Sequence, residues 1–404
     1  MSRVGRDGRL LLAARALRMF GYGYVSVVLG LYLRSLGFDD LTVGLLLGAA
    51  LGGTALMTVA WTLLADRVGR RRTLLVTAAL MCVAGLLFAV GDAAWIFALA
   101  ALTGTITPSR AELGVFTTID QAVLPATASS SSQRTWLFSA YGLIGAAAGA
   151  LGSLFAGTTD LLGGAGLAET DAFRVLFAVY AAIGLANLLL FAGLSDAVEE
   201  GAGVGRRFSG VHRSRGIVLR LAGLFAVDAF AGGFVVQALV AYWFALRWDL
   251  QPGELGVLFF VAGVLSAASF AGAGWLAGRI GLLNTMVFSH IPSNLFLILV
   301  PLAPTAPLAA AAFLARSALS QMDVPTRQSY TMALVDPDER VATAGIANVV
   351  RSLAAIGSPM LAGVAFGTAA IGLPFMVAGG LKIAYDLALY RMLRPVQLPG
   401  DENG

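Results

Sequence analysis

Apolar residues arrive along this chain in blocks of about twenty, separated by short polar breaks or by breaks that contain glycine or proline. Because a helix rises about 1.5 Å per residue, such a block matches the roughly 30 Å hydrocarbon core of a bilayer. The pattern predicts an all-α polytopic membrane protein with twelve spans. Their approximate limits are 11–35, 41–65, 73–91, 94–124, 135–157, 172–195, 217–246, 254–277, 284–303, 307–334, 341–366 and 371–393.

Arginines are distributed unequally between alternate loops. Arg34, Arg174 and Arg247 lie on one side of the predicted bilayer. Cations are retained on the cytoplasmic side, so we expect a multi-pass protein of a bacterial-type plasma (inner) membrane with both termini cytoplasmic. The other side carries Arg3, Arg6, Arg9, Arg67, Arg70, Arg71, Arg72, Arg134, Arg206, Arg207, Arg213, Arg215, Arg279, Arg340, Arg391 and Arg394.

The longest polar interruption, 196–216, lies near the middle of the chain. It predicts two six-helix bundles, 1–195 and 217–404, joined by a cytoplasmic linker, with a short cytoplasmic tail at the end of the second. Segments 64–73 and 276–285 share Leu-Ala, Arg, Gly and Thr at one offset. Parallel repeats of this kind place two bundles around a site near the bilayer midplane. A duplicated helical scaffold without transport is the alternative.

The segment 64–71, Leu-Ala-Asp-Arg-Val-Gly-Arg-Arg, resembles the loop signature of the major facilitator superfamily (MFS), G-x-L-A-D-R-x-G-R-R. Thr62 stands where that pattern has its first glycine. With the span count, the midpoint linker and the degenerate second copy, the resemblance covers nearly the whole chain and implies the MFS fold. It also implies a conformational latch, with a topology anchor as the alternative; the latch residues are Asp66, Arg67, Gly69, Arg70 and Arg71.

Two other family patterns are eroded. Segment 110–114 is similar to the fourth-span Arg-x-x-Gln-Gly pattern of drug/proton antiporters, but Leu113 replaces the glutamine. The fifth span lacks the proline expected in those antiporters. It carries a face of small residues that favours close helix packing, made of Gly142, Gly145, Gly149 and Gly152.

Ionisable side chains inside a bilayer are costly and need partners, so each one is a functional candidate. Asp228 lies near mid-depth of the seventh span and Arg351 at a similar depth in the eleventh. In the family that the sequence resembles, the first, fourth, seventh and tenth helices line the cavity. The resemblance therefore implies further candidates for the solute or proton pathway: Tyr22, Tyr24, Arg110, Glu112, Gln237, Tyr242, Arg316, Gln321 and Asp323.

Asp228 is the first candidate for a coupling carboxylate, since loss of an ion pair during rocking would let it bind or release a proton. A permanent pair with Arg351 or Arg316 is the alternative. For Arg110 and Arg316, recognition of a carboxylate or phosphate competes with simple pairing to Glu112 or Asp323.

Three other polar residues of the spans are expected to be structural. Lys382 and Asp386 are four residues apart and can neutralise one another on one helix face. His290 is interpreted as a packing histidine, because no cysteine or carboxylate spacing around it suggests zinc. We therefore expect no metal and no cofactor.

Composition narrows the function. The chain is 58% hydrophobic and 12% charged, against roughly a quarter charged in soluble domains. A net charge of +4, scattered over span ends, does not form a nucleic-acid groove. No catalytic motif or Walker loop occurs, so we expect no enzyme.

We predict a monomeric secondary active transporter that moves a small molecule across the lipid bilayer by alternating access. The predicted subtype is proton-coupled efflux of an organic or hydrophobic compound. The alternatives are uptake of a nutrient or an organic anion, and a non-transporting membrane receptor or scaffold.

Overall fold

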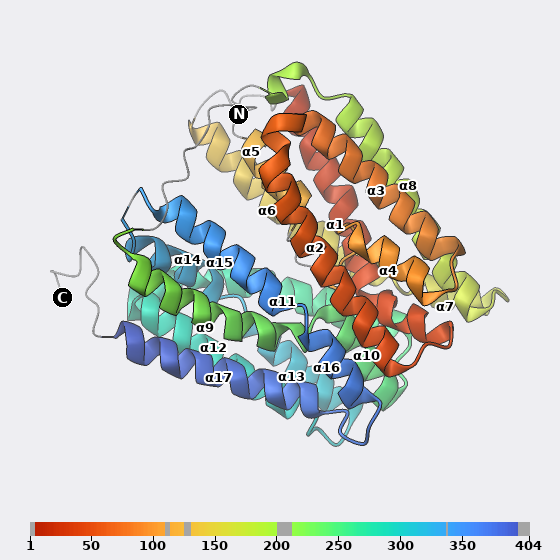
Figure 1. Ribbon diagram of the computed structural model, residues 1–404. Coiled ribbons are helices and arrows are strands. Elements are labelled where there is room, and N and C mark those ends of the chain that lie inside the picture. Colours follow the sequence, from red (N-terminus) through yellow and green to blue (C-terminus); the bar gives the residue numbers. More distant parts are fainter. Residues whose placement is uncertain (1–4, 110–113, 125–130, 200–211, 337, 395–404) are drawn as a thin grey trace. The chain divides into compact units, whose positions relative to one another are not determined.

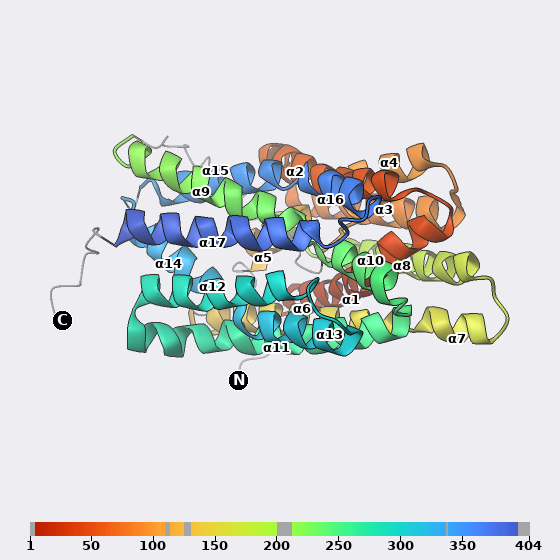
Figure 2. The ribbon, with the colours of Figure 1, turned by 90° about the horizontal axis from the view of Figure 1, so that it is seen from below.

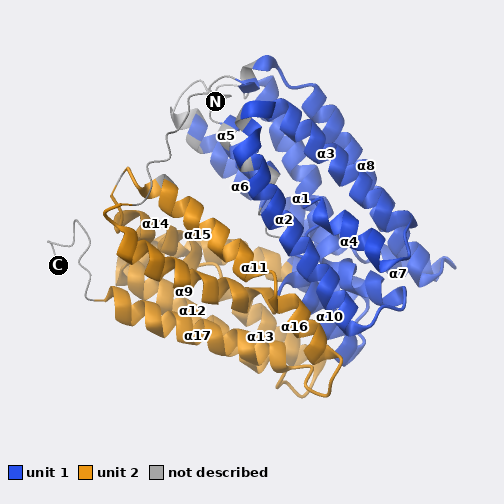
Figure 3. Ribbon diagram, in the orientation of Figure 1, with its two compact units in different colours: residues 1–206, 236–260 blue, residues 207–235, 261–404 orange. Residues whose placement is uncertain are grey.

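The computed structural model describes residues 5–109, 114–124, 131–199, 212–336 and 338–394. These residues form helices and no strands (Figure 1). The chain divides into two compact units, one of residues 1–206 and 236–260, the other of residues 207–235 and 261–404 (Figure 3).

Unit 1 contains most of the helices of the first half of the chain. The helix α11 (Pro252–Ile280) begins in this unit and continues into unit 2. The other helices are α1 (Arg6–Ser35), α2 (Asp40–Val68), α3 (Arg70–Val90), α4 (Ala94–Leu102), α5 (Val115–Val123), α6 (Ser131–Phe155), α7 (Thr158–Gly164), α8 (Glu169–Ala192), the 3₁₀ helix η2 (Asp196–Glu199) and α10 (Gln237–Trp248).

Glycine allows the closest helix contacts in unit 1. A Cβ added at Gly85 would lie 2.6 Å from the backbone nitrogen of Ala181, and one at Gly184 would lie 2.5 Å from that of Cys82. Both pairs join α3 to α8, which run side by side in Figure 1. Between α1 and α6, a Cβ at Gly152 would lie 2.1 Å from the carbonyl oxygen of Phe20. The predicted small-residue face therefore packs a helix at Gly152, whereas Gly142 has nothing within 4 Å.

In the described residues of unit 2 there are the last part of α11 and seven further helices. Figure 2 shows α17 between α9 and α12, in agreement with the contacts that join these helices. The helices are α9 (Arg215–Gly233), α12 (Leu282–Leu299), α13 (Ala306–Leu319), α14 (Asp323–Ala333), α15 (Arg340–Ala354), α16 (Ser358–Phe366) and α17 (Leu373–Leu393). A buried cluster around Phe225, Met286, Tyr330 and Tyr385 forms part of the core of this unit.

Ten helical stretches of the described chain are long and apolar enough to cross a membrane. The expected spans 94–124 and 307–334 are instead pairs of shorter helices, α4 with α5 and α13 with α14. The expected seventh and eleventh spans are also interrupted, between α9 and α10 and between α15 and α16. The sequence thus predicts where apolar segments lie but not that four of them break.

The breaks coincide with residues that disfavour a continuous helix. Gly104, after α4, has φ +68°, which side chains other than glycine rarely adopt. Gly232 and Gly233 end α9, and Pro359 stands in the first turn of α16. Pro325 lies in the first turn of α14, where its missing N–H costs no helical hydrogen bond.

Residues 236–260 belong to unit 1, although the predicted halves place them in the middle of the second bundle. The helix α10 contacts α1, and Gly30 of α1 lies against the Tyr242 side chain. The backbone N–H of Ala238 donates to the carbonyl of Pro108 at 3.0 Å. The halves 1–195 and 217–404, with their linker, stay a prediction.

Candidate functional site

A cluster of buried charges lies in unit 2 around Asp228 of α9, which is 3% exposed. Lys382 of α17 places Nζ 2.6 Å from its carboxylate. Arg327 of α14 lies 3.2 Å from Asp228 and 3.1 Å from Asp323, and Arg351 of α15 lies 3.5 Å from Asp228. We call these five residues the Asp228 cluster. It joins four helices by three cations and two carboxylates.

The cluster satisfies the rule that charges inside a bilayer occur in pairs. The buried Asp228 carboxylate has lost its contact with water and needs opposite charges nearby, because an unpaired buried carboxylate costs several kcal/mol. Of the two partners that the sequence left open for Asp228, Arg351 lies 3.5 Å from its carboxylate. Asp228 forms no ion pair with Arg316 among the described residues, and the cations that pair with it most closely, Lys382 and Arg327, were not predicted as its partners.

A second pair adjoins this cluster along α17. His290 of α12 places Nδ1 2.8 Å from the Asp386 carboxylate, and the amide of Asn294 donates to the same carboxylate at 3.4 Å. All three side chains are buried. The predicted pairing of Lys382 with Asp386 is therefore wrong, because each of the two points to another helix. The imidazole is satisfied, as expected of a packing histidine.

Unit 1 contains a separate buried cluster that we call the Arg18 cluster. Arg18 of α1, which is fully buried, places a guanidinium nitrogen 2.5 Å from Asp120 of α5 and donates to Asn187 of α8 at 3.3 Å. The Tyr141 hydroxyl donates to Asp120 at 3.0 Å and accepts from Arg15 at 3.1 Å. This network holds α1, α5, α6 and α8 together.

Sequence reasoning missed the Arg18 cluster. Arg15 and Arg18 stand near the start of the first span, so they resemble the positive charges that flank a span, and Asp120 was not considered. The available signal was the presence of an aspartate and two arginines inside expected spans. Because their pairing depends on contacts between α1 and α5, the sequence does not reveal it.

The candidates on α1 are buried among aromatic side chains. Tyr24 is fully buried and donates its hydroxyl to the carbonyl of Leu176 at 3.1 Å. Tyr22 is 4% exposed, and its ring centroid lies 6.4 Å from that of Tyr180. These contacts give both tyrosines a packing role in unit 1.

The two candidates on α10 differ in their contacts. Tyr242 is 1% exposed, and its hydroxyl donates to the carboxylate of Asp40 at the start of α2. Gln237 begins α10, and its buried amide nitrogen has no hydrogen-bond partner among the described residues. An amide without a partner is available to a ligand.

The tenth-span candidates also separate. Asp323 is engaged by Arg327, so the predicted pairing of Asp323 with Arg316 is not what the structure has. Arg316 forms no ion pair within the described part of the chain, and its Nε is buried without a partner. The backbone N–H of Gln321 donates to Ser269 at 3.2 Å. Arg110 and Glu112 lie outside the described residues.

The predicted latch loop makes a contact that the sequence did not indicate. Glu199 of η2 accepts from the backbone N–H groups of Arg70 and Arg71, at 2.8 and 2.9 Å. The Arg71 guanidinium also lies 3.3 Å from Asp196. The segment after α8 is thereby fixed to the first turn of α3.

The remaining latch residues are less constrained. Gly69 has φ +100°, which explains the glycine at this turn. Arg67 is exposed, and the Asp66 side chain lies outside what the structure describes. The latch role of these residues stays a prediction.

Apolar spans that carry internally paired ionisable groups are typical of membrane transport proteins. The family model "Major Facilitator Superfamily" matches residues 11–359. The chain therefore belongs to this superfamily and is a multi-pass membrane transporter, as the loop signature implied.

The chain is also similar to individual known proteins. The uncharacterized membrane protein YJR124C of Saccharomyces cerevisiae is 27% identical over 420 residues, covering 96% of this chain and 94% of that protein. The nucleoside transporter NupG is 12% identical with a TM-score of 0.74, covering 96% of this chain and 99% of that one. The inward-open xylose transporter XylE from E. coli is 15% identical with a TM-score of 0.74, covering 99% and 98%. Likeness to these structures establishes the fold.

Proposed function

We propose that this protein is a proton-coupled secondary transporter that exports a small organic compound, and that the Asp228 cluster is its coupling element. The supporting observation is the burial of Asp228 among Lys382, Arg327 and Arg351. These cations come from three different helices, so movement between helices changes the charge around one carboxylate. The similarity of segment 110–114 to drug/proton antiporters favours the export direction.

The physical basis is the cost of an unpaired charge. While the three cations surround Asp228, its negative charge is compensated. If rocking withdraws one or more of them, the ionised carboxylate becomes expensive, and proton binding restores neutrality. A later return of the cations would release the proton. This cycle links one proton to one conformational change, with no cofactor.

The test uses purified full-length protein in liposomes that contain a pH-sensitive dye. The probes are ethidium, benzoate, xylose and uridine, supplied with and without an imposed pH gradient. We expect one of them to drive proton movement in the wild type. Asp228→Asn should abolish the dependence on the pH gradient and retain counterflow, because exchange without net proton movement needs no titrating group.

The matched control is Asp171→Asn, which removes an exposed carboxylate 3.3 Å from Arg174. It should behave as the wild type. Because Asp228→Asn leaves three cations together, Arg351→Gln provides a milder second variant; Arg351 has the longest contact in the cluster. If both variants couple transport to protons as the wild type does, the cluster is structural.

A second candidate is uptake of an organic anion. The Asp228 cluster contains three cations against two carboxylates, and Arg316 adds a buried guanidinium without an ion pair in the described residues. An anion would compensate this excess. Accumulation of benzoate by the wild type would favour this function over export. Arg316→Gln should then lose the accumulation of benzoate and keep its behaviour towards xylose.

We further propose a monomer in a plasma membrane of the bacterial type, with both termini cytoplasmic. The arginine-rich loops support the orientation. The internal repeat supports a monomeric transporter, since one chain supplies both of the predicted bundles.

A further inference from the structure

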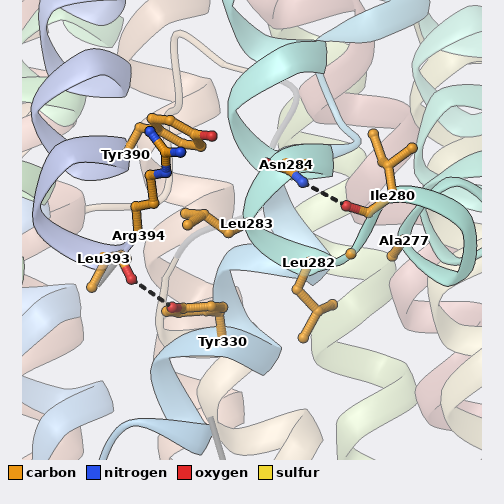
Figure 4. A pocket seen from close by; sticks show the side chains of 10 residues that line it. Ala277, Ile280, Leu282, Leu283, Asn284, Tyr330, Tyr390, Leu393 and Arg394 are labelled. Carbon is orange, nitrogen blue, oxygen red and sulfur yellow. Dashed lines mark hydrogen bonds between the residues drawn. The ribbon is translucent and has the colours of Figure 1, made fainter. Parts of the chain in front are cut away.

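A cavity of about 520 Å³ lies within unit 2, at the ends of α11, α12 and α17 (Figure 4). Its walls include Asn284 of α12, Tyr330 of α14, and Tyr390 and Arg394 at the end of α17. The volume is within the range of roughly 300–1,000 Å³ that is common for ligand sites. In Figure 4, Tyr390 and Arg394 lie across the cavity from Asn284 and Ile280.

The first turn of α12 forms one wall of this cavity. Gly281, which precedes it, has φ +84°. In the described chain, the backbone N–H groups of Leu282 and Leu283 have no hydrogen-bond acceptor. A helix start of this kind carries a partial positive charge and favours an anion.

The internal repeat provides an independent indication that this turn binds an anion. Gly69 and α3 in unit 1 correspond to Gly281 and α12 in unit 2. In unit 1 the Glu199 carboxylate accepts from the two N–H groups that follow the glycine. Both glycines have positive φ and extended ψ, 139° and 162° respectively. The same turn therefore has its acceptor in unit 1 and lacks one among the described residues of unit 2.

A cation also borders the cavity. Arg394 is exposed and forms no ion pair with the described part of the chain. Its guanidinium carbon lies 5.9 Å from the Tyr390 ring centroid. Among the described residues that line the cavity there is no aspartate or glutamate. Positive charge thus approaches it from both Arg394 and the start of α12.

We propose that this cavity binds the phosphate headgroup of an anionic phospholipid. Its walls coincide with the ends of three candidate membrane spans, at Ile280, Leu282 and Leu393, which places it at headgroup depth. Ile280, 39% exposed, gives the cavity an apolar side next to its polar one. Basic pockets between helices at this depth suit lipid phosphates. A soluble phosphate has no apolar group that could contact the apolar wall.

The test measures binding of short-chain phosphatidylglycerol and phosphatidylcholine to the purified full-length protein in detergent by native mass spectrometry. The wild type should prefer phosphatidylglycerol. Arg394→Gln should weaken that binding about fivefold, since one basic residue near an anionic headgroup contributes about that factor. The matched control is Arg391→Gln, an exposed arginine one turn earlier on α17 that does not line the cavity. It should leave the preference unchanged.

A second variant tests the helix start. Leu282→Pro removes one N–H at the first helical position, where proline is tolerated, and should also weaken phosphatidylglycerol binding. Equal binding in Arg394→Gln, Arg391→Gln and the wild type would overturn the proposal. If inorganic phosphate displaced the lipid at equal concentration, the ligand of the cavity would be a soluble anion and not a lipid, and the proposal would be overturned. In a last outcome, Asp401→Asn/Glu402→Gln would raise the affinity for the lipid by as much as Arg394→Gln lowers it. The carboxylates of Asp401 and Glu402 would then occupy the cavity in place of a lipid, and the proposal would likewise be overturned.

Discussion

At the residue scale, the charges of the Asp228 cluster depend on one another. Lys382 approaches Asp228 to 2.6 Å, and Arg327 bridges Asp228 and Asp323. Asp228 therefore offsets the burial of cations from three other helices, and Asp323 offsets the burial of Arg327 on its own helix. Removal of a single member leaves its partners buried and uncompensated, whereas removal of an opposite pair preserves the balance.

The first prediction measures this dependence between Asp228 and Lys382. Lys382→Met removes the closest cation, and breaking a buried pair costs about 3–5 kcal/mol; we expect the low end because two arginines remain. Asp228→Asn/Lys382→Met should be less destabilised than the sum of the single variants by about 1–3 kcal/mol. Unfolding in mixed detergent measures the four free energies. Additive values would contradict a direct interaction.

The second prediction concerns pH and Glu339, which precedes α15 outside the membrane-spanning segment. Burial raises the pKa of this carboxyl group. The backbone N–H groups of His212, Arg213 and Ser214, at 2.6–3.0 Å, outweigh that effect and lower the pKa to about 2, against an ordinary 4.5. A lowered pKa in the folded state stabilises the protein above the ordinary pKa, and this contribution is lost as the pH falls through 4.5 towards 2.

Glu339→Gln should therefore lower the melting temperature at pH 7 and reduce its fall between pH 5 and pH 3. Differential scanning fluorimetry of the protein in detergent checks both effects. Asp336→Asn, which changes an exposed carboxylate 3.8 Å from Arg213 in the same loop, is the control and should follow the wild type. A Glu339→Gln profile parallel to that of the wild type would show that the three N–H contacts do not control stability in acid.

At the scale of elements, close helix packing and helix breaks have different origins. Glycine permits the backbones of α1 and α6 to meet at Gly152. The sequence predicts this, because small residues recur at helical spacing in the fifth span. It does not predict the break between α13 and α14, since the surrounding segment is apolar enough to be counted as one span.

The third prediction compares two glycines of α6. Gly152→Ala places a Cβ 2.1 Å from a backbone oxygen of α1, so the helices must separate, at a cost of about 1–3 kcal/mol. Gly142→Ala has open space and should be neutral or slightly stabilising, because alanine favours the helix. The half-life of each variant on heating in detergent distinguishes them. Similar half-lives would mean that α1 and α6 tolerate separation.

At the scale of the whole molecule, the seventh predicted span connects the two units. Its first part, α9, belongs to unit 2 and carries Asp228, and its second part, α10, belongs to unit 1. The break at Phe234 and Val235 lies within two turns of Asp228. A change in the ion pairs of Asp228 is therefore close to the point where the chain passes from one unit to the other.

Hydropathy and the loop signature were enough to predict the fold class and the family. They were enough because lipid forces apolar residues into blocks, and Leu64–Arg71 retains its pattern. Asp228 was also recognised as a buried charge that needs partners, since a charge within an apolar block is conspicuous. Its partners Lys382 and Arg327 were not found. Spacing along one helix suggested that Lys382 pairs with Asp386, whereas contacts between helices decide the pairing.

The last prediction tests the orientation of the whole chain. Retention of cations on the cytoplasmic side places both termini and the arginines 70–72 in the cytoplasm, and Gly166, between α7 and α8, on the opposite side. Reporter fusions active only in the cytoplasm should be active at residues 1 and 404 and inactive at Gly166. Alkaline phosphatase fusions should give the reverse pattern. Termini on opposite sides would require an odd number of spans, which is incompatible with two parallel bundles of six.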